Sequence, residues 1–317
     1  MKLGGVVPCT DSKSGDGVPA AARDVGGELP ASLAAERWHA LLASASPSCK
    51  ARNLYRGPGW AASLRLVDAL ETASTEFEWR IISAGYGLLR PDEQVTRYSA
   101  TFLAGHTDSV PGTGAGGDLC GAWWSQVNRL RGQSQPLAKF ASEVDGLVVA
   151  ASAPYVDAIG HELAAVAKQV PTVVFCAGRP RDPVVAGLAP RFDRRLREGE
   201  DPFVRGGDVG FNQRVATRVV EILGPAVVDR ARVDGVLAAA MDREGPVRHE
   251  RQVASDATVM AFINAALTVD QSVSRTALLR RWRDRGRACE QGRFRALFER
   301  VMAERNEQLM LGEAACG

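Results

Sequence analysis

The sequence predicts an α/β protein with a doubly wound, mainly parallel sheet and a C-terminal helical appendage. Two short apolar runs, residues 144–150 and 170–176, are rich in β-branched side chains, which is typical of central strands buried on both faces. Residues 154–168 between them carry apolar side chains at helical spacing. A strand, a helix and a second strand in this order indicate a right-handed crossover and therefore parallel strands.

The elements before this crossover show the same alternation of strands and helices. Leu3–Val7 is a short apolar run that ends at Pro8, and it predicts a buried first strand. Residues 77–83 alternate in polarity and predict a second strand. Helical spacing is present at 29–43, at 59–73 and around Trp123 and Trp124, whereas the Gly-, Thr- and Ser-rich stretch 105–117 predicts a loop.

The C-terminal part of the chain is expected to be helical. Residues 178–207 are rich in Arg, Pro, Gly and Asp and predict a long polar loop, after which a helix over 211–223 closes the core. We therefore expect an α/β core over 1–225 and a helical region over 226–317. Three helices are expected there, at 255–267, 274–285 and 288–309, with Ser274 as N-cap and Gly286 as C-cap of the middle one. This order is typical of a helix-turn-helix or winged-helix region.

The composition excludes several classes of protein. The chain has 317 residues and a net charge of +2, so a role in nucleic-acid binding would need a local basic patch. Its six cysteines form no C-x-x-C pair and its four histidines form no cluster with them, which argues against zinc and against a disulfide framework. Apolar runs are too short for a membrane helix. We expect a cytoplasmic monomer with reduced thiols and without metal or cofactor.

Three polar loops follow the predicted strands and indicate a functional site. They are residues 9–15, 83–89 and 151–155, and all are rich in Ser, Gly or Tyr. Ligands of an open parallel sheet bind beyond the carboxyl ends of its strands, so these loops are expected to form one pocket. Common motifs are missing from them: no G-x-x-x-x-G-K-[ST] loop, no G-x-G-x-x-G turn and no G-x-S-x-G elbow is present.

Several side chains of these loops are candidates for chemistry or binding. Asp11 at the mouth of a strand can serve as a general base or an electrostatic stabiliser, although a turn-capping role is the alternative. Lys13 beside it is also a candidate catalytic group, expected with Asn212 to face a leaving base. Asp208 is a second candidate carboxylate, with N-capping as its alternative. Nine residues are expected to contact the substrate, and the three tyrosines among them are suited to stacking on a base. They are Cys9, Thr10, Ser12, Ser83, Tyr86, Tyr98, Ser152, Tyr155 and Asn212. Arg214 is expected to hold a phosphate.

The order of motifs resembles a bacterial domain family of largely unassigned function that is distantly similar to the peroxide-stress DNA-binding family. The residues that carry the resemblance are C-T-D-S-K at 9–13, N-L-Y-R-G at 53–57, S-A-G-Y-G-L-L at 83–89 and Y-S-A-T-F at 98–102. The core is also similar in outline to the uracil-DNA glycosylase superfamily. That superfamily's G-Q-D-P-[YG] motif is absent, and the nearest equivalent is Pro8-Cys9-Thr10-Asp11.

Together with a basic appendage, this resemblance implies an anti-phage DNA glycosylase acting on modified bases such as glucosylated hydroxymethylcytosine. Residues 275–300 contain nine arginines and three acidic residues. The arginines expected to contact DNA phosphates are Arg280, Arg281, Arg283, Arg287 and Arg293. The alternative is that these helices merely pack on the core. Two other functions stay open: a nucleoside or RNA N-glycosidase or transglycosylase, and a DNA-binding stress protein without catalysis.

Overall fold

The computed structural model describes residues 1–15, 20–26, 29–46, 49–111, 119–198, 202–242 and 252–314. The chain divides into two units, Met1–Pro246 and Val247–Gly317, and each has a hydrophobic core of its own. This division comes later than the expected boundary between 225 and 226. The reason is that helix α10 (Arg230–Asp242) buries Val233 and Leu237 completely in the core of the first unit.

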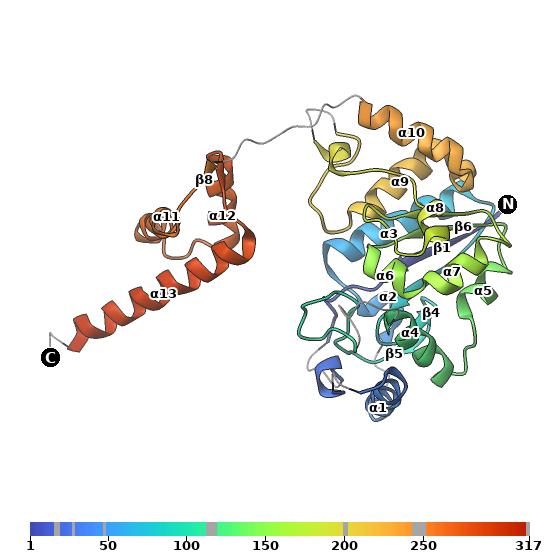
Figure 1. Ribbon diagram of the computed structural model, residues 1–317, viewed down its shortest axis with the longest axis horizontal. Coiled ribbons are helices and arrows are strands. Elements are labelled where there is room, and N and C mark those ends of the chain that lie inside the picture. The colour runs from blue at the N-terminus through green and yellow to red at the C-terminus, as the bar shows by residue number, and fades with distance from the viewer. Residues whose placement is uncertain are drawn as a thin grey trace. The chain divides into compact units, whose positions relative to one another are not determined.

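The first unit is built on a five-stranded sheet with β1 at its centre (Figure 1). The strand order is β4 (Gly87–Leu89), β3 (Glu76–Ser83), β1 (Lys2–Pro8), β6 (Gly146–Ala150) and β7 (Thr172–Phe175). Strands β3, β1, β6 and β7 are parallel, and β4 runs antiparallel to β3 at one edge. The expected α/β architecture with a mainly parallel sheet is confirmed.

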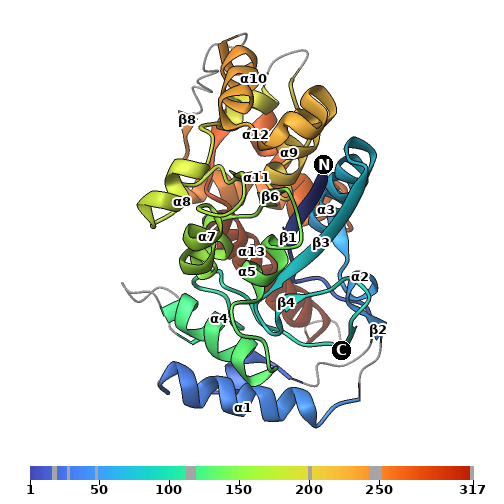
Figure 2. The same ribbon diagram turned by 90° about the vertical axis from the view of Figure 1, so that its right-hand side faces the viewer.

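Helices cover both faces of this sheet (Figures 1 and 2). Two adjacent glycines of β1 show how closely the helices on the two faces approach this strand. A Cβ atom on Gly4 would come within 3.1 Å of the Phe140 ring in α5 (Pro136–Ala141), and one on Gly5 would come within 3.2 Å of Leu70 in α3 (Gly57–Ala73). Because neighbouring residues of a strand point to opposite faces, glycine at both positions lets the two helices approach the central strand from either side.

The remaining elements of this unit match the expected helices closely. The helix predicted over 154–168 is divided at Ile159 into α6 and α7. The stretch 178–207, expected to be a long loop, contains the short helix α8. Its N-cap Asp182 accepts hydrogen bonds from the N–H groups of Val184 and Val185. None of the described helices is long and apolar enough to cross a lipid bilayer. The further elements are η1 (Ala22–Asp24), α1 (Ala31–Ala43), β2 (Cys49–Lys50), α2 (Ala51–Leu54), β5 (Gln94–Val95), α4 (Leu119–Leu130), α6 (Ala153–Ala158), α7 (Gly160–Val166), α8 (Pro183–Leu188), η2 (Arg194–Arg197), α9 (Phe211–Leu223) and η3 (Gly224–Val228).

The second unit contains three helices and a short parallel pair of strands in its described part. Its elements are β8 (Gln252–Val253), α11 (Asp256–Val269), α12 (Arg275–Asp284), β9 (Arg287–Ala288) and α13 (Gln291–Ala314). As expected, Ser274 caps α12: its Oγ accepts a hydrogen bond from the Ala277 N–H. Trp282 and Phe294 are buried in its core. The helices α11 and α12 thus follow each other in the chain, and the expectation of a helical C-terminal region is met in its described part.

Candidate functional site

The carboxyl ends of β1, β3 and β6 bring the three predicted loops to one edge of the sheet. The Cys9 N–H continues the β1–β3 ladder by donating to the Ile82 carbonyl at 2.8 Å. The Cys9 thiol lies 3.5 Å from the Tyr155 hydroxyl, which belongs to α6 directly after β6. The expectation that the loops after separate strands meet is therefore confirmed for Cys9 and Tyr155. We call this edge of the sheet the rim.

The loop after β1 is fixed by the chain segment that joins α2 to α3. Ser14 N–H donates to the Leu54 carbonyl at 2.7 Å, and Arg56 N–H donates to the Ser12 carbonyl at 2.9 Å. These bonds flank a bridge between Lys13 and Tyr55. The Thr10 hydroxyl lies 3.0 Å from the Arg56 carbonyl oxygen and contributes to the same attachment. The backbone of the loop is thus held on both sides of Lys13.

The Lys13 side chain is buried against aromatic rings. Only 9% of the residue is exposed, and Nζ lies 4.3 Å from the centre of the Tyr98 ring and 5.9 Å from that of Tyr55. Nζ donates to the backbone carbonyl of Asp11 at 3.3 Å. Within the described part of the chain it makes no ion pair with a carboxylate. Burial is the main reason why the pKa of this ammonium is lowered from its ordinary value of 10.5.

The tyrosines around Lys13 form a buried chain of hydroxyl groups. Tyr55 Oη lies 3.1 Å from Tyr98 Oη, which in turn lies 2.7 Å from Ser83 Oγ. Ser83 Oγ also accepts hydrogen bonds from the backbone N–H groups of Gly85 and Tyr86. Burial raises the pKa of both Tyr55 and Tyr98 well above the ordinary tyrosine value. These hydroxyls therefore stay protonated and supply no negative charge to Lys13.

Asp11 faces the opposite way and is accessible to solvent. Its side chain is 64% exposed, and Oδ2 lies 3.7 Å from Nε2 of His106. His106 Nδ1 accepts a hydrogen bond from the Asp108 N–H at 3.0 Å, so in the neutral ring the proton is on Nε2, which faces Asp11. An exposed carboxylate next to an oriented imidazole can exchange a proton with a bound ligand or water.

The segment 98–110, which carries His106, contributes further residues to the rim. Its Asp108 is only 4% exposed, accepts a hydrogen bond from Ser99 Oγ at 2.7 Å and pairs with Arg23 at 3.1 Å. Sequence reasoning did not single out His106 or Asp108. The signal was the neighbouring Y-S-A-T-F motif, since its Thr101 exchanges backbone hydrogen bonds with Asp108 and Val110. Residues 112–117 of the predicted loop 105–117 lie outside the described residues.

The predicted stacking role is wrong for Tyr98 and Tyr155 as their rings are placed, because both are buried, whereas Tyr86 is half-buried. Tyr98 is covered by Lys13 and by the edge of Trp38, at 6.1 Å between centres. Tyr86 packs edge-on against Tyr98, and its hydroxyl accepts a hydrogen bond from the Thr96 N–H. Tyr155 packs against Phe102. Their rings stabilise the rim from inside because aromatic area is buried where the protein offers partners. Ser83 is likewise engaged inside the protein.

The residues at the start of α9 also have structural partners. Asn212 joins two strand ends, since Nδ2 donates to the Ala151 carbonyl at 2.7 Å and Oδ1 accepts from the Ala177 N–H at 2.9 Å. These two hydrogen bonds give the Asn212 amide a structural role between the two strand ends, so its position does not need a ligand to explain it. Arg214 donates to the carbonyls of Gly207 and Val209 and thereby holds its own loop instead of a phosphate.

Asp208 does not act as the expected N-cap side chain and lies on the surface. Gly210 precedes α9 as its N-cap, and Asp208 forms an ion pair with Arg197 at 2.7 Å while its side chain is 90% exposed. The same loop approaches the rim: Val209 and Thr10 both lie within 3.4 Å of the position that a Cβ on Gly59 would take. Asp208 is therefore near the rim, whereas its carboxylate is paired with an arginine.

Two hydroxyl groups of the rim face neither a backbone carbonyl nor another side chain among the described residues. Ser12 is exposed next to Asp11, and Ser152 is half-buried at the start of α6, where its side chain makes no capping hydrogen bond. His, Cys, Asp and Glu side chains of the described residues do not form a group of three that could hold a metal ion. Polar side chains of the rim that are exposed or half-buried thus include Asp11, Ser12, His106 and Ser152, whereas Lys13 keeps 9% of its surface exposed.

No family model, no curated protein and no solved structure matches this chain. The chemistry of the rim therefore has to be inferred from its own residues. An exposed carboxylate, an oriented imidazole and a buried amine lie within one loop and the segment that crosses it. This combination is suited to acid–base chemistry on a polar ligand.

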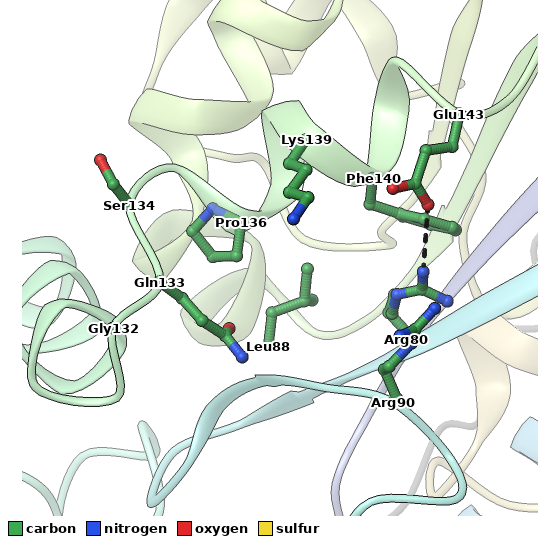
Figure 3. Close-up of a pocket in the computed structure, with 10 residues that line it drawn as sticks. All are labelled: Arg80, Leu88, Arg90, Gly132, Gln133, Ser134, Pro136, Lys139, Phe140 and Glu143. Carbon is green, nitrogen blue, oxygen red and sulfur yellow. Dashed lines mark hydrogen bonds and ion pairs between the residues drawn. The ribbon is translucent and has the colours of Figure 1, made fainter.

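A cavity of about 350 Å³ lies elsewhere, between β3, β4 and α5 (Figure 3). Lys139 and Gln133 point into it, and Arg80 is at its wall. Arg80 is held by Glu78 at 3.0 Å and by Glu143 at 3.4 Å, and its guanidinium lies 4.2 Å from the Phe140 ring. Because these contacts already satisfy the arginine, the cavity offers binding volume but lacks the acid–base pair of the rim.

The arginines of the second unit differ in their availability. Arg293 pairs with Asp256 and also donates to the Ala254 carbonyl, and Arg283 donates to the Cys289 carbonyl at 3.2 Å. These two residues therefore stabilise their own unit, and the expectation that they are free for phosphates is wrong. Arg280 and Arg281 are exposed, and Arg287 is exposed while it lies over the Trp282 ring. They remain candidates for contact with an anion.

Proposed function

We propose that the protein is a DNA glycosylase, which hydrolyses the N-glycosidic bond of a modified base and leaves an abasic site. The observation that carries this proposal is the exposed Asp11 carboxylate beside His106 Nε2 at the carboxyl edge of a parallel sheet. Support also comes from the resemblance in outline between the core and the uracil-DNA glycosylase superfamily. The basic second unit is consistent with a polyanionic substrate.

The reaction places opposite demands on the two sides of the scissile bond. As the bond breaks, the sugar acquires positive charge and the base leaves with negative charge. The Asp11 carboxylate stabilises the sugar cation and takes a proton from the attacking water, and His106 orients this carboxylate through its Nε2–H. The Ser12 hydroxyl next to Asp11 donates to the departing base. The target nucleotide is first rotated out of the duplex at a cost of a few kcal/mol.

The arginines that remain exposed on α12 are assigned to the DNA backbone. Arg280 and Arg281 are exposed on this helix, and Arg280 lines a cavity of about 330 Å³ in the second unit. Phosphates neutralised by such side chains release counterions, so binding depends steeply on salt. The second unit thus supplies affinity for DNA, and the rim supplies the reaction.

Replacement of both Arg280 and Arg281 by glutamine is expected to weaken duplex binding. Loss of two phosphate contacts lowers the slope of log K against log salt by about 2. Fluorescence anisotropy with a labelled duplex at several salt concentrations measures this slope. The matched control replaces Arg295 and Arg300, which are also exposed but pair with Glu299 at 2.8 Å and with Glu304 at 2.9 Å, closer than the 4.0 Å between Arg280 and Asp284. A control pair that lowers the slope as much as the α12 pair would contradict the assignment of α12.

The proposed reaction is tested by mass spectrometry of the free bases that the purified protein releases. Duplexes with glucosylated hydroxymethylcytosine, with other modified bases and with unmodified bases are compared, and each is treated with alkali to reveal abasic sites. We expect release from a modified duplex and none from unmodified DNA. Release from nucleosides alone would indicate the small-molecule N-glycosidase instead. Binding without any release would indicate a DNA-binding protein.

A further inference from the structure

We infer that Lys13 is an amine nucleophile, which forms an imine with the aldehyde of an abasic sugar and cleaves the DNA strand on its 3′ side. This inference rests on the proposed function, because it names a second step at the same rim. It begins from one observation: the Lys13 ammonium group is buried beside Asp11 and, among the described residues, makes no ion pair with a carboxylate, which a buried lysine usually has.

The partners of Lys13 explain why it is suited to this role. Among the described residues its Nζ has one hydrogen-bond acceptor, the Asp11 backbone oxygen, whereas an ammonium offers three N–H donors. The rings of Tyr55 and Tyr98 attract a cation, yet a carboxylate would do so far more strongly. A structural lysine at this position would be expected to complete its hydrogen bonds. The arrangement instead disfavours the charged form of this amine, so its pKa is lowered.

Some groups around Lys13 lower the pKa of its ammonium and others raise it. Burial against the tyrosine rings lowers its pKa most, and the positive charge of Arg97 lowers it further. Cys9 on β1, Asp11 on the same loop and Asp108 on the segment 98–110 raise it, but by less than burial. Tyr55 and Tyr98 stay protonated, so they add no opposing charge. The neutral amine therefore becomes available at a lower pH than in an ordinary lysine.

The proposed strand cleavage proceeds through an imine between Lys13 and the sugar. The neutral amine adds to C1′ of the ring-opened sugar aldehyde, and the resulting carbinolamine loses water to give a protonated imine. Asp11 then takes a proton from C2′, the electron pair of that C–H bond forms a C2′–C3′ double bond, and the 3′-phosphate leaves with the C3′–O electrons. Water hydrolyses the imine and restores the amine. No oxidant, reductant or metal is consumed.

The distance in sequence between the two groups supports their cooperation. Lys13 and Asp11 belong to one loop, whose backbone is fixed by Ser14, Arg56 and their partners. The Lys13 side chain is directed inward over Tyr98, whereas the Asp11 side chain is directed outward to His106. A sugar bound between them would present C1′ to the amine and C2′ to the carboxylate. Loss of either group is therefore expected to affect strand cleavage.

The experiment uses the full chain and a duplex that already contains one abasic site. Sodium borohydride reduces an imine to a stable amine, so it traps protein and DNA as a covalent adduct. We expect one adduct on a denaturing gel, and peptide mapping by mass spectrometry is expected to place it on Lys13. The chain contains five lysines and an N-terminal amine, so the map is unambiguous. The initial rate of trapping should rise with pH and level off below pH 10.5, the ordinary lysine value.

The variant Lys13→Met and its control sharpen this test. Methionine has a similar length and no charge, so it fits between the tyrosine rings without a buried ammonium. We expect a loss of trapping of at least about 100-fold with Lys13→Met, whereas Lys50→Met at an exposed position keeps it. An adduct on another lysine or on the N-terminus, or trapping that survives in Lys13→Met, would overturn the inference.

A parallel measurement separates this inference from the proposed function. Free bases released from a modified duplex are measured with the same protein preparation. Base release without any adduct on abasic DNA would overturn the lyase step and leave the glycosylase intact. An adduct on Lys13 without release from any modified base would support the amine nucleophile and remove the glycosylase proposal.

Discussion

Replacement of Asp11 by asparagine is expected to lower the rate of base release by about 10²–10⁴-fold, the usual contribution of a general acid–base group. Asparagine keeps the shape of the side chain but cannot take a proton or carry the charge that stabilises a sugar cation. The fold should not change, since the Asp11 side chain is 64% exposed and only its backbone holds the loop and Lys13. Single-turnover release of the base measures the effect.

The matched control for this variant is Asp208→Asn. Asp208 is the other carboxylate near the rim, and it is more exposed but paired with Arg197. We expect its replacement to leave the rate within about threefold of the wild type. His106→Gln should give an intermediate loss, because the imidazole lies beside the Asp11 carboxylate in the proposed reaction. Equal losses in Asp11→Asn and Asp208→Asn would contradict the assignment of Asp11.

Replacement of Gly87 by alanine is expected to destabilise the first unit by about 3 kcal/mol or more, through left-handed backbone strain and overpacking. Gly87 has a φ of +69°, and a Cβ atom there would collide with the side-chain amide of Asn128. Asn128 cannot move freely, because it is 1% exposed, accepts a hydrogen bond from the Leu88 N–H and donates to the Trp124 carbonyl. Displacing it also costs these buried hydrogen bonds.

Gly132→Ala is the control for this second prediction. Gly132 has a φ of +72°, close to that of Gly87, but a Cβ atom there has no neighbour within 4 Å. The control therefore carries the backbone strain without the collision, and we expect it to cost about 1–2 kcal/mol. Urea unfolding followed by tryptophan fluorescence measures both variants, since five of the six tryptophans belong to the first unit. Equal losses of stability would show that contact with Asn128 is unimportant.

Most of the fold could be predicted because the strands and helices have simple periodicity. The apolar runs that became β1, β6 and β7 are buried on both faces, so continuous hydrophobicity was sufficient to find them. The antiparallel strand β4 was missed because it is only Gly87–Leu89 and follows a tight turn. The boundary between the units was placed too early, since α10 has a weakly patterned sequence and its burial depends on α9 and η3.

The location of the candidate site could be predicted from the sequence, but the roles of several of its residues could not. Asp11 and Lys13 lie on the rim as expected, whereas Asn212 and Tyr98 are used inside the protein. Such a difference cannot be seen in the residue types, because amides and phenols serve buried hydrogen bonds as readily as ligand contacts. His106 was missed since a single histidine in a polar stretch has no periodic signal, and the neighbouring Y-S-A-T-F motif marks its segment without marking the histidine itself.

The sequence by itself determined the alternation of strands and helices, the parallel sheet and the edge at which polar loops gather. These follow from local patterns of polarity and from the handedness of crossovers, which neighbouring residues specify. Only the tertiary structure decided that Lys13 is buried over Tyr98 while Asp11, two residues earlier, is exposed beside His106. The physical reason is that burial and pKa depend on segments distant in the chain, here 53–56 and 98–110, which close over the loop after β1.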